Sequence, residues 1–124
     1  MNYHTDLEQS AVQINSEEKG KICAHFVFGE KLSLFKGHFP GNPILPGVIQ
    51  IEMVKYCLEN IIQEPLFLQK VNKTKFTSLI HPDKAVMVEI NFDTSEKGGF
   101  DARAVVRVEN VVAGKVIMTL TRQI

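Results

Sequence analysis

Two residues in the first half of the chain have the types that acid–base chemistry requires. His38 lies in a loop, and Glu52 lies in the apolar segment that follows it. The loop holds three prolines and three glycines between residues 37 and 47. Proline fixes φ and glycine permits conformations closed to other residues, so this loop has a restricted shape and would fix where His38 points. We interpret His38 as the base and Glu52 as the acid of one site.

The helix that follows the loop is predicted to begin at Pro46, because proline is well tolerated in a first turn. The free N–H groups of a helix start suit a carbonyl oxygen that gains negative charge. An acid on a buried helix can have the raised pKa that an acid catalyst needs near neutral pH. A base, an acid and an oxyanion site would together suit proton abstraction beside a thioester carbonyl with loss of a β-hydroxyl.

The residues alone leave a plainer alternative open for both side chains. Glu52, Lys55 and Glu59 share one helix face and could form a solvated charged stripe. His38 could simply cap a turn. His4 and His25 carry no partner motif, and we expect a surface role for the first and a structural role for the second.

The pattern of apolar residues predicts one long helix and a sheet. Between Val48 and Ile62, ten of 15 residues are apolar, which predicts a helix buried on most sides and ended by Gln63-Glu64-Pro65. Residues 1–10 are polar, and we expect them to form a loosely held segment before the first strand. The predicted strands are Ser10 to Asn15, Lys21 to Phe28, Leu66 to Phe76, Ala85 to Asp93, Phe100 to Glu109 and Val116 to Thr121, with turns at Ser16 to Gly20, His81 to Lys84, Ser95 to Gly99 and Asn110 to Gly114. The fold class is α+β, with five or six largely antiparallel strands.

Composition narrows the classes of function. The chain of 124 residues fits one domain, 1–124, and its 44% apolar and 23% charged residues are ordinary for a soluble protein. The formal net charge of zero argues against nucleic-acid binding. No segment looks like a membrane span or a secretory signal, and Cys23 and Cys57 fit free thiols, so we expect a cytoplasmic protein. Isolated histidines and the lack of a Gly-rich phosphate loop imply no metal or redox cofactor.

The loop and helix together resemble a known signature. Gly37-His38-Phe39-Pro40-Gly41-Asn42-Pro43, then Leu45-Pro46-Gly47-Val48, then Glu52 is similar to the motif of the hot-dog-fold 3-hydroxyacyl-[acyl carrier protein] dehydratases. Weaker similarity continues through Lys75 to Pro82 and Phe100 to Ile117. The resemblance implies a lyase that converts 3-hydroxyacyl thioesters to trans-2-enoyl thioesters in fatty acid or related lipid or polyene biosynthesis.

Carried over to this sequence, the resemblance assigns roles to six residues. His38 and Glu52 would be the catalytic pair, and Gly47 would supply the backbone N–H that polarises the thioester carbonyl. Phe39, Pro46 and Val48 would lie beside it in the substrate-binding part of the site. The resemblance also implies a long central helix wrapped by the sheet of each subunit, and a double hot-dog homodimer in which His38 and Glu52 of one site come from different subunits. A trimer of dimers is the larger alternative.

Three departures from the family pattern concern residues outside the catalytic pair. Residues 1–30 lack the His-Arg-Tyr-Pro-Phe-type segment of the fatty-acid branch, Tyr56 stands where that branch has glutamine, and the usual Pro-Gly-Asp turn is Pro82-Asp83-Lys84. A hot-dog thioesterase and a non-catalytic acyl-thioester binding module remain as alternatives. The expected partner is an acyl carrier protein, with coenzyme A as the alternative acyl carrier. Docking candidates are Lys31, Lys36, Lys70, Lys73 and Lys75, although dispersed solubilising lysines explain them equally well.

Overall fold

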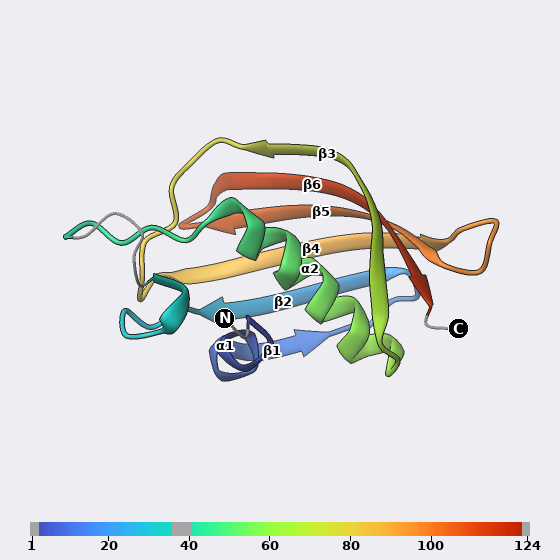
Figure 1. Ribbon diagram of the computed structural model, residues 1–124, viewed down its shortest axis with the longest axis horizontal. Helices are drawn as coiled ribbons and strands as arrows, with labels where there is room; N and C mark the ends of the chain where they lie inside the picture. Colours follow the sequence, from blue (N-terminus) through green and yellow to red (C-terminus); the bar gives the residue numbers. More distant parts are fainter. Residues whose placement is uncertain (1–2, 36–40, 123–124) are drawn as a thin grey trace.

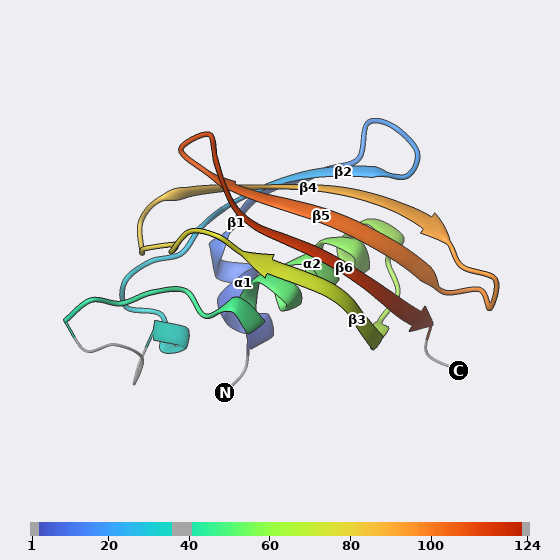
Figure 2. The same cartoon turned by 90° about the horizontal axis from the view of Figure 1, so that it is seen from above.

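One six-stranded antiparallel sheet curves around a single long helix. The computed structural model describes residues 3–35 and 41–122. The strand order in the sheet is β1-β2-β4-β5-β6-β3, and Figures 1 and 2 show the sheet bending over one side of α2. The elements are α1 (Tyr3–Ser10), β1 (Ala11–Asn15), β2 (Lys21–Val27), the 3₁₀ turn η1 (Ser33–Phe35), α2 (Gly47–Ile62), β3 (Leu66–Phe76), β4 (Ala85–Thr94), β5 (Phe100–Val108) and β6 (Val111–Arg122). The expected α+β class and the helix wrapped by an antiparallel sheet are confirmed.

Alternation along the strands places the core between the sheet and α2. In β2 the side chains of Ile22, Ala24 and Phe26 are buried, whereas the residues between them are exposed. Ala24 pairs across the ladder with Val88 of β4, and Val88 pairs with Val106 of β5, so one buried row crosses three strands. A sheet with one apolar face packed on a helix produces this period of two.

The helix α2 buries one face completely and the rest only in part. Its buried residues are Ile49, Gln50, Met53, Val54, Cys57 and Leu58. The expected burial on most sides is not reached within this chain, because the sheet lies on one side of α2 and the short helix α1 covers only part of the other. Val48 on that side is 50% exposed. Among residues 3–35 and 41–122, no helix is long and apolar enough to span a membrane.

Residues Tyr3–Ser10 form the helix α1, so the prediction of a loose lead-in for residues 1–10 was wrong over this range; residues 1 and 2 lie outside the described residues. Asp6 and Leu7 of α1 are buried. The Asp6 carboxylate accepts hydrogen bonds from Ser33 Oγ at 2.8 Å and from Leu34 N at 3.2 Å. The rings of His4 and Tyr56 meet edge to face at 5.4 Å between centroids, which connects α1 to α2. These partners lie far along the chain, so the polar local sequence did not reveal them.

The turn between the last two strands is shorter than predicted. Glu109 and Asn110 both have positive φ and form a two-residue connection, so β6 begins at Val111 rather than Val116. Such turns match the twist of a hairpin. Gly114, interpreted from sequence as part of the turn, is instead a buried residue inside β6, paired with Val106 and Phe76.

The strand β3 forms one edge of the sheet. It pairs with β6 on one side, and no other described strand lies on its free side. Apart from Leu66 all of its residues are exposed, including Phe67, Leu68, Val71 and Phe76. A long edge strand with apolar side chains is a surface that soluble proteins normally cover.

Candidate active site

The helix α2 begins beside the loop that joins β3 to β4. Pro46, expected as the first helical residue, is the N-cap in extended conformation at φ −62° and ψ 146°, and the helix starts at Gly47. The preceding segment is held by a hydrogen bond from Leu45 N to Ile80 O at 2.8 Å. Leu45 itself is buried. The start of the helix is therefore fixed in place by backbone contacts and by a core side chain.

The first turn of α2 offers unoccupied hydrogen-bond donors. Pro46 provides no side-chain cap, and Ile49 N already donates to Pro46 O at 3.0 Å. Within the described part of the chain, the N–H groups of Gly47 and Val48 have no acceptor. The N-terminal end of a helix carries partial positive charge, so these donors suit an oxygen that becomes negative.

A cavity of about 230 Å³ lies at this helix start. It is lined by Ile44, Leu45, Pro46, Gly47, Gln50, Phe76, Ser78 and Leu79. The Phe76 ring lies so close to Gly47 that a methyl group on that glycine would come within 2.6 Å of the ring. Glycine at position 47 thus permits the close approach of an aromatic wall to the helix end. Gly47 and Pro46 both line this cavity, whereas Val48 does not, and the roles assigned to these three residues stay predictions.

Gln50 is a site residue that the sequence did not single out. Its side chain is 2% exposed, and Oε1 is the one buried side-chain oxygen or nitrogen of the described chain that has no hydrogen-bond partner. A methyl group added to Gly114 of β6 would overlap with this oxygen. From sequence, Gln50 counted only among the polar residues of α2. A buried, unpaired amide becomes apparent only when the sheet is laid over the helix.

Glu52 is half-buried and differs from the two charged residues that follow it. Lys55 Nζ and Glu59 Oε1 are 3.7 Å apart, and Glu59 Oε2 accepts a hydrogen bond from Leu66 N at 2.8 Å. Glu52 has no hydrogen bond or ion pair with any residue that the structure describes. The charged stripe considered from sequence therefore reduces to one pair, and Glu52 stands apart from it.

Two of the residues assigned to the site, His38 and Phe39, lie outside the described residues. Their roles stay predictions, as does the pairing of His38 with Glu52. In the described ranges, no group of three His, Cys, Asp or Glu residues could hold a metal ion. Burial raises the pKa of the Cys57 thiol to about 12, so this cysteine is protonated at neutral pH and unsuited to act as a nucleophile.

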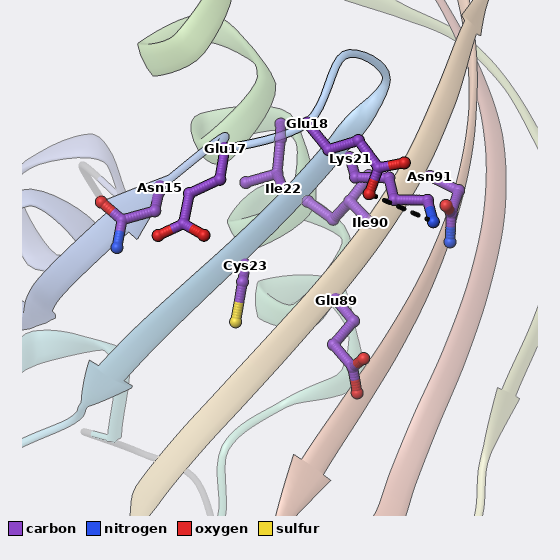
Figure 3. A pocket seen from close by; sticks show the side chains of 9 residues that line it. All are labelled: Asn15, Glu17, Glu18, Lys21, Ile22, Cys23, Glu89, Ile90 and Asn91. Carbon is purple, nitrogen blue, oxygen red and sulfur yellow. Dashed lines mark ion pairs between the residues drawn. The ribbon is translucent and has the colours of Figure 1, made fainter.

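A larger cavity, of about 440 Å³, lies elsewhere on the molecule. It is lined by Asn15, Glu17, Glu18, Lys21, Ile22, Cys23, Glu89, Ile90 and Asn91 (Figure 3). The Lys21 ammonium lies 3.6 Å from the Glu18 carboxylate, and both side chains are mostly exposed. None of its lining residues belongs to α2 or to the loops around the helix start. This larger cavity therefore lies apart from the candidate site at the helix start.

Comparison with known proteins identifies the family. The family model described as ApeI-like, ApeI dehydratase, matches residues 13–115. A 3-hydroxyacyl-[acyl-carrier-protein] dehydratase, FabZ, of Wolbachia pipientis is 31% identical over 109 residues, covering 82% of this chain and 75% of the relative. The chain belongs to the ApeI-like dehydratase family.

Two further comparisons show how much of each chain the similarity covers. A bifunctional LpxC/FabZ enzyme of Chlorobaculum tepidum is 33% identical over 96 residues, which is 69% of this chain but only 21% of that protein. The solved structure of the dehydratase heterocomplex ApeI:P from Xenorhabdus doucetiae superposes with a TM-score of 0.75 at 22% identity, covering 90% of this chain and 96% of that one. The fold is thus the hot-dog fold of these dehydratases.

The contact between Gln50 and Gly114 can be tested by adding a methyl group. We expect Gly114→Ala to lower the free energy of unfolding by about 1–3 kcal/mol, because the methyl group overpacks the space that holds the Gln50 amide. Urea denaturation would measure this change. Gly29→Ala is the matched control, since a methyl group there meets nothing within 4 Å. In the Gln50→Ala background the amide is absent, so Gly114→Ala should cost less stability there than in wild-type protein. An equal cost in both backgrounds would show that the overlap with Gln50 is not the cause.

Proposed function

We propose that this protein removes water from 3-hydroxyacyl thioesters to give trans-2-enoyl thioesters. The observation that carries the proposal is the uncapped start of α2, whose Gly47 and Val48 N–H groups lie beside an apolar cavity in a chain of a dehydratase family. Free backbone donors stabilise the negative charge that develops on a thioester carbonyl when the neighbouring carbon loses a proton. Relatives carry the name of this activity at modest identity, and the chain spans only part of some of them.

The proposed reaction uses one residue for each developing charge. His38 takes the proton from C2, and negative charge accumulates on the thioester oxygen, where the Gly47 N–H holds it. The electron pair then forms the C2–C3 double bond as the C3–O bond breaks. Glu52 gives its proton to the departing hydroxyl, which leaves as water. A return of the proton from His38 to Glu52, directly or through water, restores the starting state.

The site is proposed to be shared between two chains. Strand β3 exposes its free edge together with Phe67, Leu68, Val71 and Phe76, and the Glu52 side of α2 is only partly covered by this chain. Pairing of β3 with the β3 of a second chain would cover that edge and bring a second loop toward Glu52. The partner is a second copy of this chain. A related hot-dog chain is the alternative, because the similar solved structure from Xenorhabdus is a heterocomplex.

The acyl group is proposed to arrive on an acyl carrier protein, as the names of the relatives suggest. Carrier docking would use a positively charged surface. Lys70, Lys73 and Lys75 are exposed on β3, next to the Phe76 wall of the cavity, and Lys31 is exposed elsewhere. Lys36 lies outside the described residues.

The reaction is tested by following two products at once. With 3-hydroxyacyl thioesters of several chain lengths on both acyl carrier protein and coenzyme A, we expect enoyl absorbance to rise without release of free thiol. Thiol release without enoyl formation would instead indicate a thioesterase. Binding of the thioester with neither product would indicate a non-catalytic binding module.

The shared site predicts complementation between inactive variants. We expect His38→Ala and Glu52→Gln each to lower kcat by about 10²–10⁴, the range for a positioned acid or base. When the two variants are co-expressed, each mixed dimer holds one intact site, so part of the activity should return. Exposed Glu18→Gln is a control that should keep full activity. Failure of any mixture to exceed the single variants, with mixed dimers shown to be present, would contradict a site built from two chains.

The role of the Gly47 N–H is tested by a pair of substitutions at one position. Gly47→Pro removes the N–H but keeps a residue that suits the first helical position. Gly47→Ala keeps the N–H and introduces a similar contact with the Phe76 ring, so it controls for crowding. We expect the proline variant to have a kcat about 10²–10³ lower than the alanine variant. Equal rates in the two folded variants would remove the oxyanion role from Gly47.

A further inference from the structure

The amide of Gln50 lacks the hydrogen bonds that a buried polar group needs. Its side chain is 2% exposed, and Oε1 has no partner among the residues that the structure describes. Leaving such a group unpaired is costly, and a buried leucine of similar size would avoid that cost. Gln50 also lines the cavity at the start of α2. An unpaired amide at a cavity wall points to a ligand that supplies the missing hydrogen bond.

The chemistry of the cavity restricts the group that Gln50 would meet. Among the described lining residues, the other side chains are apolar except for Ser78, and none of them carries a charge. Away from the helix start, a charged ligand group would find no counter-charge on these side chains, which is unfavourable. The amide oxygen accepts a hydrogen bond, so its partner must be a donor. A neutral hydroxyl on an otherwise apolar chain satisfies both conditions.

The partner of Gln50 is not the hydroxyl that leaves in the reaction. Glu52 of the proposed site comes from the second chain, whereas Gln50 Oε1 lies beneath the sheet of its own chain, against Gly114 of β6. Glu52 is assigned to the 3-hydroxyl in the proposed reaction. Gln50 lies on the buried face of α2, and Glu52 lies on the partly covered side. A group bound by Gln50 is therefore different from the 3-hydroxyl.

We propose that Gln50 determines specificity for acyl thioesters that carry a second hydroxyl group further along the chain. This inference rests on the proposed dehydratase function. In it, the thioester carbonyl lies at the Gly47 N–H, the chain follows the apolar wall of Phe76 and Leu79, and its second hydroxyl donates to Gln50 Oε1. A simple alkyl chain of the same length leaves the amide unpaired and is a poorer substrate.

The test compares substrates that differ by one oxygen atom. A series of 3-hydroxyacyl thioesters of one chain length is prepared, each with a second hydroxyl at a different carbon beyond C4, together with the plain alkyl member. For wild-type protein we expect at least one position of the second hydroxyl to raise kcat/KM tenfold or more over the plain chain. A site built to hydrogen-bond a hydroxyl rejects the substrate that lacks it, whereas an apolar pocket gives no preference for the hydroxylated chain.

Two variants attribute the preference to the amide. In Gln50→Leu and Gln50→Met the ratio of kcat/KM for the preferred hydroxylated substrate to that for the plain chain should fall to within threefold of one. Exposed Gln13→Leu on β1 is the matched control and should keep the wild-type ratio. Urea midpoints of all three variants separate altered selectivity from altered folding.

The outcomes separate this inference from the one on which it rests. A wild-type protein that dehydrates plain and hydroxylated chains equally well would overturn the role of Gln50 and leave the dehydratase function standing. A preference that survives in folded Gln50→Leu would also overturn it. If no member of the series were dehydrated, both the function and the role of Gln50 would fail.

Discussion

The first turn of α2 lies directly beneath the end of the β3–β6 pair, and two glycines permit that contact. The Phe76 ring packs closely against Gly47 of the helix, and the Gln50 amide packs closely against Gly114 of β6. A methyl group at either position would require the Phe76 ring or the Gln50 amide to shift, because interiors tolerate little added volume. The aromatic wall of the cavity depends on this close approach.

One long helix, α2, under a six-stranded sheet leaves part of the described structure uncovered. The sheet covers one face of α2, while Val48 on another face is half exposed. Strand β3 offers a row of unpaired backbone groups at the edge, together with exposed Phe67 and Val71. Both features concern the same region of the molecule, since β3 ends at the Phe76 wall of the cavity. A partner on this edge would complete the fold and the site together, which supports the proposed shared active site.

The sequence predicted correctly those helices and strands whose pattern of apolar residues lies within the element itself. The period of two in β2 and β5 and the apolar run of α2 placed these elements within a residue or two of their ends. α1 was missed because Asp6 is held by Ser33 and Leu34, which lie far along the chain. Gly114 was misread because glycine marks turns and close approaches alike. Gln50 was passed over because only the folded sheet shows that its amide is buried and unpaired.

The two acidic residues of α2, Glu52 and Glu59, differ in the contacts that they make within the fold. Glu59 accepts the N–H of Leu66 and pairs with Lys55, so it fixes the end of α2 to the start of β3. These two contacts give the Glu59 carboxylate a structural role. Glu52 makes no comparable contact within the described chain, although it is half-buried on the same side of the helix. A carboxylate placed there contributes nothing visible to the stability of this chain, and a part in chemistry with a second chain is the explanation that the proposed dimer supplies.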